Sequence, residues 1–238
     1  MGARAKSRSV RTPTRSPLAS VRSLTPPQTS ESLLRASKEP DFRQERSRRS
    51  YVALIEAATE LFAANGYDAV GTPEIAQRAG VSVGTFYRYF DDKHEVYLEI
   101  MRRTMIAAHD ETLRGLTPER FVGRARRDTI SEAVGIVFQH VLERPELTRS
   151  FMEMSLRDPA VADLRRAFDQ VACQRLTVLI ETVTSRESVP DPEAFAYVLY
   201  GSSMQCAYGL AVHLMPPSLS KDRARAALTT FIERALFP

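Results

Sequence analysis

Polar side chains suited to noncovalent recognition gather at positions 85–89 of the chain. Thr85 carries a hydroxyl and a methyl group, which suit contact with a base edge or with a thymine methyl group. Tyr87, Arg88 and Tyr89 carry donors that suit hydrogen bonds to phosphate oxygens. These residue types predict contact with DNA. The simpler interpretation is that Tyr87 packs half-buried and that Arg88 is a solvated charge.

Two small residues and one lysine flank this segment. Val83 and Gly84 have little bulk, so the backbone can approach a DNA groove closely there, although Val83 can contact only a methyl group. Lys93, in the first turn of the next predicted helix, is placed to bind a phosphate. We therefore expect these three residues to extend the same surface.

Two short helices, over 72–79 and 83–89, must position these groups. Gly80 lies between them and permits a tight turn, as in a helix-turn-helix. Apolar residues of the segment are spaced to pack inward on the preceding helix. They are Ile75, Ala76, Ala79, Val81, Phe86 and Phe90.

The rest of the chain is also expected to be helical. Oxygen acceptors precede prolines at Thr72-Pro73, Thr117-Pro118, Asp158-Pro159 and Asp191-Pro192, a pattern typical of helix starts. Asp92 and Glu95 are spaced as a capping box. Together with apolar periodicity, these signals predict about nine helices, over 47–65, 72–79, 83–89, 92–114, 117–143, 145–156, 158–187, 191–214 and 220–236.

Charge divides the chain unevenly. Residues 1–50 contain twelve Lys or Arg against four Asp or Glu, whereas the whole chain has a net charge of only +4. A basic segment beside a folded module is typical of nucleic-acid contact, and a solvated tail is the alternative. We expect an all-α protein in which residues 1–42 form a disordered basic extension, residues 43–92 a three-helix helix-turn-helix domain and residues 93–238 a second helical layer.

Residues 48–105 resemble the N-terminal domain of the TetR family. The elements that carry the resemblance are Leu61-Phe62, Gly66-Tyr67, Ile75-Ala76, Ala79-Gly80-Val81-Ser82, the run from Gly84 to Phe90, and Lys93. Each element alone is weakly specific, but their combination is highly specific. The resemblance covers about a quarter of the chain, and the remainder is similar only in being a helical tail of suitable length.

The resemblance implies a one-component transcriptional regulator, most often a repressor. Val83 departs from the family pattern, in which Lys or another polar residue is common, so the bases that are read remain open. The resemblance implies DNA contact for Thr85, Tyr87 and Tyr89, and phosphate contacts for Thr72 and Lys93.

The resemblance also implies that the C-terminal layer encloses a cavity for a small effector. Apolar walls with a few phenol groups would favour a lipophilic molecule, acyl or polycyclic. Filling of a helical core is the alternative role for each of these side chains. The candidate ligand-binding residues are Phe138, Phe151, Met152, Met154, Phe168, Tyr197, Tyr200, Met204 and Tyr208.

The last two predicted helices suggest a homodimer interface. The terminal helix has an apolar stripe that is too long to be left in water, and Gly201 belongs to a small-residue face of the helix before it. A two-fold dimer would bind a palindromic operator on double-stranded DNA. The candidate interface residues are Gly201, Ala224, Ala227, Leu228, Phe231, Ile232 and Ala235.

Other classes of function fit the sequence less well. The chain has no glycine-rich phosphate loop, nucleophile elbow or metal-ligand spacing, so we expect neither an enzyme nor a metal or cofactor. Apolar runs are too short to cross a bilayer, and Cys173 and Cys206 suit a reducing compartment, so a cytoplasmic protein is expected. A helical interaction or division protein that binds DNA without sequence preference is the principal alternative.

Overall fold

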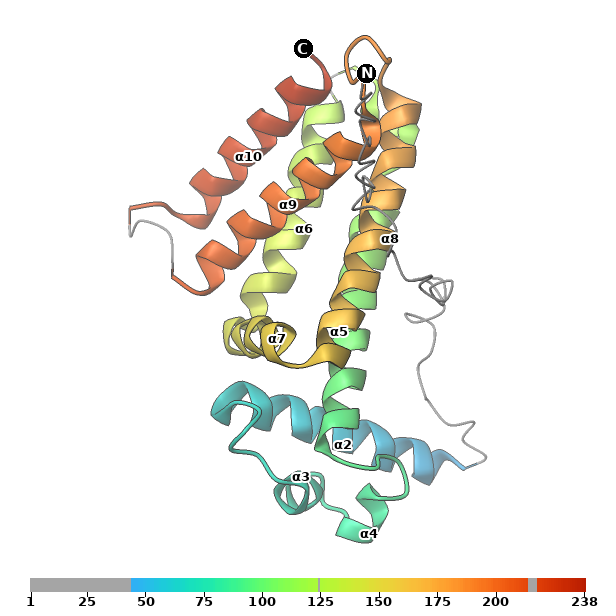
Figure 1. Cartoon of the computed structure of the whole chain (residues 1–238), viewed down its shortest axis with the longest axis vertical. Helices are drawn as coiled ribbons and strands as arrows, with labels where there is room; N and C mark the ends of the chain where they lie inside the picture. The colour runs from blue at the N-terminus through green and yellow to red at the C-terminus, as the bar shows by residue number, and fades with distance from the viewer. Residues whose placement is uncertain (1–43, 124, 214–217) are drawn as a thin grey trace, which may run out of the picture.

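A computed structural model describes residues 44–123, 125–213 and 218–238 (Figure 1). The predicted extension over 1–42 lies outside the described residues. All regular elements in the described part are helical, which confirms the all-α class with an N-terminal helix-turn-helix. They are α2 (Glu45–Asn65), α3 (Thr72–Arg78), α4 (Val83–Phe86), α5 (Lys93–Arg114), the 3₁₀ helix η1 (Pro118–Phe121), α6 (Ala125–Glu143), α7 (Pro145–Arg157), α8 (Pro159–Val183), α9 (Pro192–Ala211) and α10 (Lys221–Leu236).

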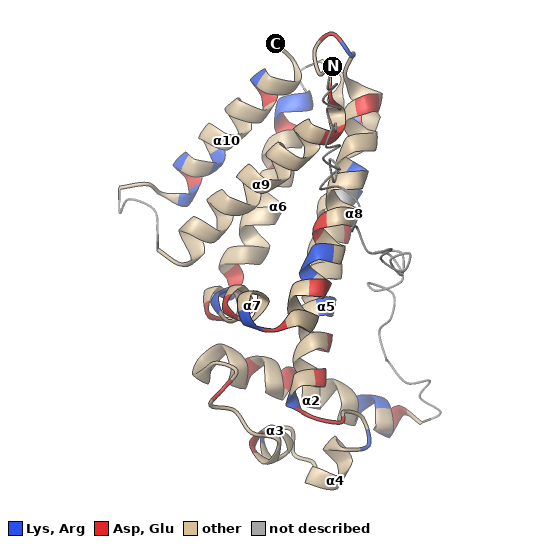
Figure 2. Ribbon diagram, viewed as in Figure 1, with Lys and Arg blue, Asp and Glu red and all other residues tan. Residues whose placement is uncertain are grey.

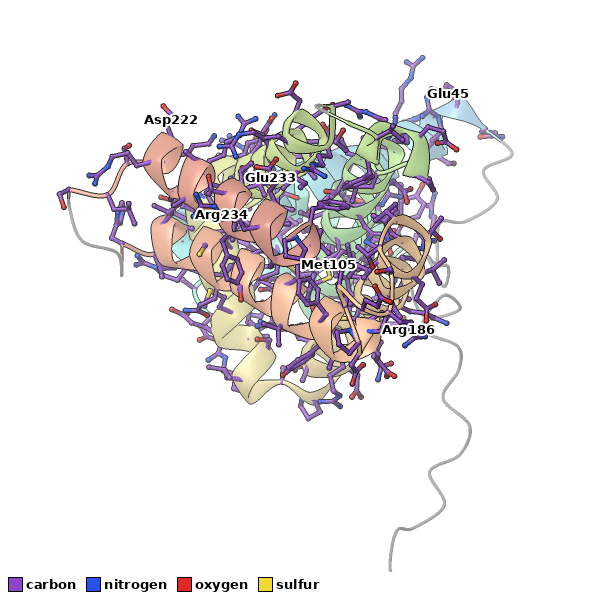
Figure 3. All side chains as sticks on the ribbon, turned by 90° about the horizontal axis from the view of Figure 1, so that it is seen from above. Glu45, Met105, Arg186, Asp222, Glu233 and Arg234 are labelled. Carbon is purple, nitrogen blue, oxygen red and sulfur yellow. The ribbon has the colours of Figure 1, made fainter. Side chains whose placement is uncertain are left out.

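The helices form a head and a body. The head, α2 to α4, lies at the bottom of Figure 1, and α6, α9 and α10 lie at the opposite end. Helix α5 runs from the head into the body and packs against α2, α6 and α8. A view from above labels Met105 of α5, which packs against the head core, and Asp222 and Arg234 of α10 (Figure 3). Helix α5 therefore contacts both parts.

The apolar core of the head extends beyond the predicted boundary at residue 92. It includes the first turns of α5, and it also buries Leu147, Phe151 and Met154 from α7. A second core joins α6, α8, α9 and α10. Helix α7 therefore also contacts both parts, because its apolar face covers α2 while the helix packs on α8.

Local capping signals are confirmed at three predicted helix starts. The side chains of Asp158 and Asp191 accept hydrogen bonds from backbone N–H groups at 3.0 Å. At the start of α5, Asp92 accepts from the Glu95 N–H at 2.9 Å, and the Glu95 carboxylate accepts from the Asp91 N–H at 2.7 Å. These bonds satisfy donors that a helix N-terminus leaves unpaired.

Two threonine-proline starts differ from the prediction. Thr72 is the first residue of α3, and the residue preceding it, Gly71, is the N-cap. Thr117 opens only a short 3₁₀ helix, and Gly123 follows it with φ +62°, a conformation that glycine adopts without strain. The predicted helix over 117–143 is therefore interrupted, and α6 begins at residue 125.

Candidate nucleic-acid interface and effector cavity

A tight turn sets the angle between α3 and α4. Gly80 has φ +68°, and the Val81 N–H donates to the Ala76 carbonyl at 3.0 Å across the turn. Ser82 then caps α4, because its Oγ accepts from the Thr85 N–H at 3.1 Å. Helix α4 is shorter than the predicted 83–89, and its last residues continue as turns.

Aromatic packing fixes α4 and the residues after it on the head. Phe86 and Phe90 are buried, and the Phe90 ring stacks on Tyr51 of α2 at a centroid distance of 5.3 Å. The Tyr89 ring meets the same Tyr51 ring edge-on at 5.7 Å. Tyr51 is therefore one contact through which α2 supports the end of residues 83–90, here called the recognition segment.

Several of the predicted DNA-contacting residues remain accessible. Tyr87 is 55 % exposed, and Val83, Gly84 and Arg88 are exposed beside it. Thr85 is partly buried, with its Oγ1 2.9 Å from the Ser82 Oγ. Thr72, at the start of α3, is also partly buried. The accessible surface of the segment therefore combines a phenol, a guanidinium and small residues. Basic side chains also lie at the start of α2 (Figure 2).

Tyr89 and Lys93 have different surroundings from those that the sequence predicted. The Tyr89 hydroxyl donates to the Ser47 carbonyl at 3.1 Å, which ties the segment to α2. The Lys93 ammonium donates to the carbonyls of Tyr67, Asp68 and Val70 at 3.0, 3.3 and 2.9 Å. An ammonium has three donors, so a phosphate could replace these partners only if the loop rearranged. In this structure both residues position the head.

Replacing Lys93 with methionine is expected to lower the free energy of unfolding by about 1–3 kcal/mol, because three carbonyls lose their shared donor. Urea denaturation followed by circular dichroism measures this loss. Arg88→Met is the control, and we expect it to change stability by less than about 0.5 kcal/mol because Arg88 is exposed. Equal stabilities for the two variants would show that Lys93 is not a structural residue.

A buried ionic cluster connects α5 to the head. Glu99 is only 2 % exposed, and its carboxylate accepts hydrogen bonds from Arg102, from Arg103 at 2.8 Å and from the Tyr51 hydroxyl at 3.3 Å. The Arg103 guanidinium also lies over the Tyr51 ring, 5.2 Å from its centroid. Sequence reasoning did not find this cluster, although Glu99 and the two arginines show helical spacing.

The body contains an apolar cavity of about 170 Å³, here called the inner chamber. Its wall comes from α5, η1, α6, α8, α9 and α10. An adjoining pocket of about 440 Å³, here called the outer pocket, is open toward α7 and includes Arg103 and Arg165. The two share six wall residues, Ala108, His140, Val141, Phe168, Tyr200 and Met204.

The structure brings five of the nine candidate ligand-binding residues to these cavities. Phe168, Tyr200 and Met204 line both, and Phe151 and Tyr208 line the outer pocket. The other four candidate residues line neither cavity. Phe138 is fully buried in the second core, Met154 in the head core, Tyr197 is 71 % exposed, and Met152 is only partly buried on α7.

Polar groups cluster where the inner chamber meets the outer pocket. The Tyr200 hydroxyl donates to Asp169 Oδ1 at 2.6 Å, and Arg165 Nε lies 3.7 Å from Asp169 Oδ2. Burial raises the pKa of Asp169, although the bond from Tyr200 and the Arg165 charge oppose this effect. Arg165 also lies over the Tyr208 ring, 5.5 Å from its centroid. The mouth of the chamber is therefore polar and its interior apolar.

His109 lines the inner chamber and was not predicted as a site residue. Burial, reinforced by the Arg175 charge, lowers the pKa of His109 to about 4. Its ring meets the Phe168 ring edge-on at 5.2 Å. Its Nε2 atom is buried and has no hydrogen-bond partner among the described residues. The ring is therefore uncharged at neutral pH.

This lowered pKa predicts a pH dependence. The folded protein disfavours the charged imidazole, whose pKa in an unfolded chain is about 6.5. The stabilisation is complete above about pH 6.5 and is lost as the pH falls toward 4. Over this range we expect the unfolding free energy to fall by about 1–2 kcal/mol more in the wild type than in His109→Leu, allowing for solvent screening. Urea denaturation at each pH measures the unfolding free energy, and the same pH dependence in the wild type and in His109→Leu would contradict this prediction.

The candidate dimer-interface residues separate into two groups. Ala224, Leu228 and Ile232 are buried in the second core, where α10 packs on α6. The opposite face of α10 carries Ala227 and Ala235 beside Phe231, which is 52 % exposed, and Gly201 of α9 is also exposed. One stripe of α10 therefore serves the chain's own core, and the other is accessible.

Within the described ranges, no group of three or more His, Cys, Asp or Glu side chains is arranged to hold a metal ion. None of the helices described is both long and apolar enough to cross a membrane.

The described residues form an all-helical body that carries a helix-turn-helix head. Residues 54–100 match the family described as "Bacterial regulatory proteins, tetR family". The chain is 31 % identical to the HTH-type transcriptional activator FasR of Mycolicibacterium smegmatis, over 57 % of this chain and 58 % of that protein. It is 38 % identical to the fatty acid metabolism regulator protein of Bacillus subtilis, over 24 % of this chain and 30 % of that protein.

The fold agrees with this match. The solved structure of a Mesorhizobium loti protein superimposes with a TM-score of 0.66 at 22 % identity, covering 81 % of this chain and 98 % of that one. Residues 54–100 therefore form a helix-turn-helix domain of the TetR family, whose members are regulatory proteins. The described helices share the fold of the Mesorhizobium loti protein. The match to FasR spans little more than half of that relative's length.

Proposed function

We propose that this chain is a one-component cytoplasmic repressor that binds a palindromic operator as a homodimer and is released by a small lipophilic effector. The observation that carries the proposal is the path of α5. Its N-terminal part packs in the head core through Val96 and Ile100, and its C-terminal part lines the inner chamber through Ala108 and Thr112. A ligand that moves this helix would act on both parts.

The DNA contacts are assigned to the accessible part of the recognition segment. Tyr87 and Arg88 supply donors for phosphates, and Thr85 and Val83 supply groups that suit base edges and thymine methyl groups. Thr72 supplies a further phosphate contact. Two-fold symmetry would place the two recognition segments about 34 Å apart, or a multiple of that, along the DNA.

The effector is assigned to the inner chamber and outer pocket. The chamber's largely apolar wall suits a lipophilic molecule. A relative that matches part of this chain is named a fatty acid metabolism regulator, which agrees with an acyl effector. Phe168, Tyr200 and Met204, which line both cavities, are the contacts that we assign to it.

A chain of contacts supports coupling between the two sites. Arg103 lines the outer pocket and binds Glu99, Glu99 accepts from Tyr51, and Tyr51 packs on the end of the recognition segment. An effector that draws Arg103 away from Glu99 would weaken the contacts that hold Tyr51 in place, and Tyr51 would then support the recognition segment less firmly. A coupling free energy of about 1–3 kcal/mol is ordinary for such a transition.

Selection of bound genomic fragments by the purified protein tests the DNA assignment. We expect recovery of fragments that share a palindromic sequence, and fragments with no shared sequence would instead support a helical protein that binds DNA without preference. A reporter under the recovered promoter then gives the sign of regulation. Lower expression in the presence of the protein supports repression, and higher expression would assign an activator, as FasR is named.

Replacing Phe231 with glutamate is expected to weaken homodimerisation by at least about 100-fold, because a charge would be buried in the apolar face of α10. Sedimentation velocity across a concentration series measures the monomer–dimer equilibrium. Leu156→Glu is the matched control, since Leu156 is exposed on α7. A Phe231→Glu protein that dimerises like the control would exclude this face as the interface.

A further inference from the structure

The inner chamber has five polar side chains in its wall, and four of them already have partners. Tyr200 donates to Asp169, and the His140 Nε2 lies 2.8 Å from Glu111 Oε2. The hydroxyls of Thr112 and Ser203 donate to backbone carbonyls of their own helices, at 2.8 Å each. His109 is the fifth, and its buried Nε2 has no partner in the part of the chain that the structure describes.

A buried polar atom without a partner costs free energy, and such atoms are uncommon in folded proteins. A water molecule does not fit beside this atom in the structure, because the Nε2 atom has almost no accessible surface. Around His109 the other polar side chains of the chamber bond within the chain, and Phe168 covers one side of the ring. A ligand group in the chamber can therefore pair with the Nε2 atom only after a neighbouring side chain, such as Phe168, moves aside, and such a pair would satisfy the buried atom.

We infer that the inner chamber binds an uncharged, mainly apolar molecule with one hydroxyl or carbonyl oxygen placed to hydrogen-bond with His109 Nε2. A hydroxyl would donate to this nitrogen in one tautomer, and a carbonyl would accept from it in the other. This inference rests on the proposed effector site and adds the ligand's polar group and its protein partner.

The charge of the ligand follows from the protonation state of the imidazole. Because the pKa of His109 is lowered to about 4, the ring carries no charge at neutral pH and offers no ion pair to a carboxylate. An ionised group inside an almost wholly apolar wall would lose its hydration without compensation. Charged parts of a longer ligand would instead lie in the outer pocket, where Arg103 and Arg165 are found.

Matched pairs of small probes test the inference on the full chain. Phenol and toluene differ by a hydroxyl in place of a methyl group, and cyclohexanone and methylenecyclohexane differ by a carbonyl in place of a carbon double bond. Calorimetric titration gives the affinity ratio within each pair for the wild type, for His109→Leu and for His109→Gln. In at least one pair, we expect His109→Leu to lower the relative affinity of the oxygen-bearing probe at least fivefold. The His109→Gln variant should retain part of the wild-type preference for the oxygen-bearing probe, because the glutamine amide can still form a hydrogen bond.

A second measurement uses the wild-type protein, so its result does not depend on whether the variants fold. The ¹⁵N resonance of the His109 Nε2, identified by its loss in His109→Gln, should shift on saturation with the oxygen-bearing probe and much less with its apolar match. One outcome would overturn only the hydrogen bond to His109 and leave the chamber as a ligand site. In that outcome toluene binds, the affinity ratio within each probe pair is the same in all three proteins, and the ¹⁵N resonance does not shift selectively. Failure of all four probes to bind the wild type would overturn the chamber as a ligand site and the proposed effector with it.

Discussion

Replacing Tyr87 with alanine is expected to weaken operator binding by about 10- to 100-fold, a loss of about 1.4–2.7 kcal/mol. Tyr87 is 55 % exposed, and its ring meets the buried Phe86 ring edge-on at 5.6 Å. This packing holds the phenol on the outer side of α4, where it can meet the DNA backbone. Fluorescence anisotropy on an operator from the genomic selection, at one fixed salt concentration, measures the change.

Stability and binding must be separated in this experiment. Truncation of an exposed side chain usually changes the unfolding free energy by less than about 0.5 kcal/mol, and Tyr87→Ala is expected to stay near that range. Val178→Ala, on an exposed site of α8, is the control for operator binding. If Tyr87→Ala binds the operator as tightly as this control, Tyr87 does not contact DNA.

Replacing Glu99 with alanine is expected to lower the free energy of unfolding by about 3–5 kcal/mol, because a buried charge pair broken on one side leaves the other charge uncompensated. Arg102 is largely buried beside Glu99, and Tyr51 would lose the acceptor of its hydroxyl. Chemical denaturation gives the change in unfolding free energy, and an unchanged slope with denaturant would indicate that two-state unfolding is retained.

A surface ion pair provides the comparison for Glu99. Glu60 of α2 binds Arg78 of α3 at 2.6 Å, and both side chains are more than half exposed. Exposed pairs contribute about 0–1 kcal/mol, so Glu60→Ala should be mild. Similar small losses in both variants would mean that the Glu99 cluster does not support the head, and the proposed coupling through Tyr51 would lose its basis.

Local sequence signals predicted the parts of the fold that depend on local interactions. Asp158 and Asp191 cap their helices as expected, because an N-cap bond spans only three residues. Gly80 and the buried Phe86 also have the predicted roles in the turn and in the core. The same reasoning fails at Thr117, where Gly123 interrupts the helix that apolar periodicity favoured.

The roles that depend on distant parts of the chain could not be predicted. Lys93 binds carbonyls 23 to 26 residues away, and nothing in the spacing distinguishes this from a free lysine. The apolar stripe of α10 predicts burial but does not say which half packs on α6, so Leu228 and Phe231 could not be separated. His109 is a single histidine in sequence, and only its place in the chamber wall gives it chemical meaning.

The exposed face of α4 has a consequence for divergence among regulators of this fold. Val83, Gly84 and Arg88 are exposed, whereas Phe86 and Phe90 support the same segment from inside. Substitutions on the outer face change the chemistry offered to a base pair with little cost in stability. Gene duplication followed by a few changes at these positions could thus create a regulator for a different promoter, while the aromatic support and the cavities remain as inherited.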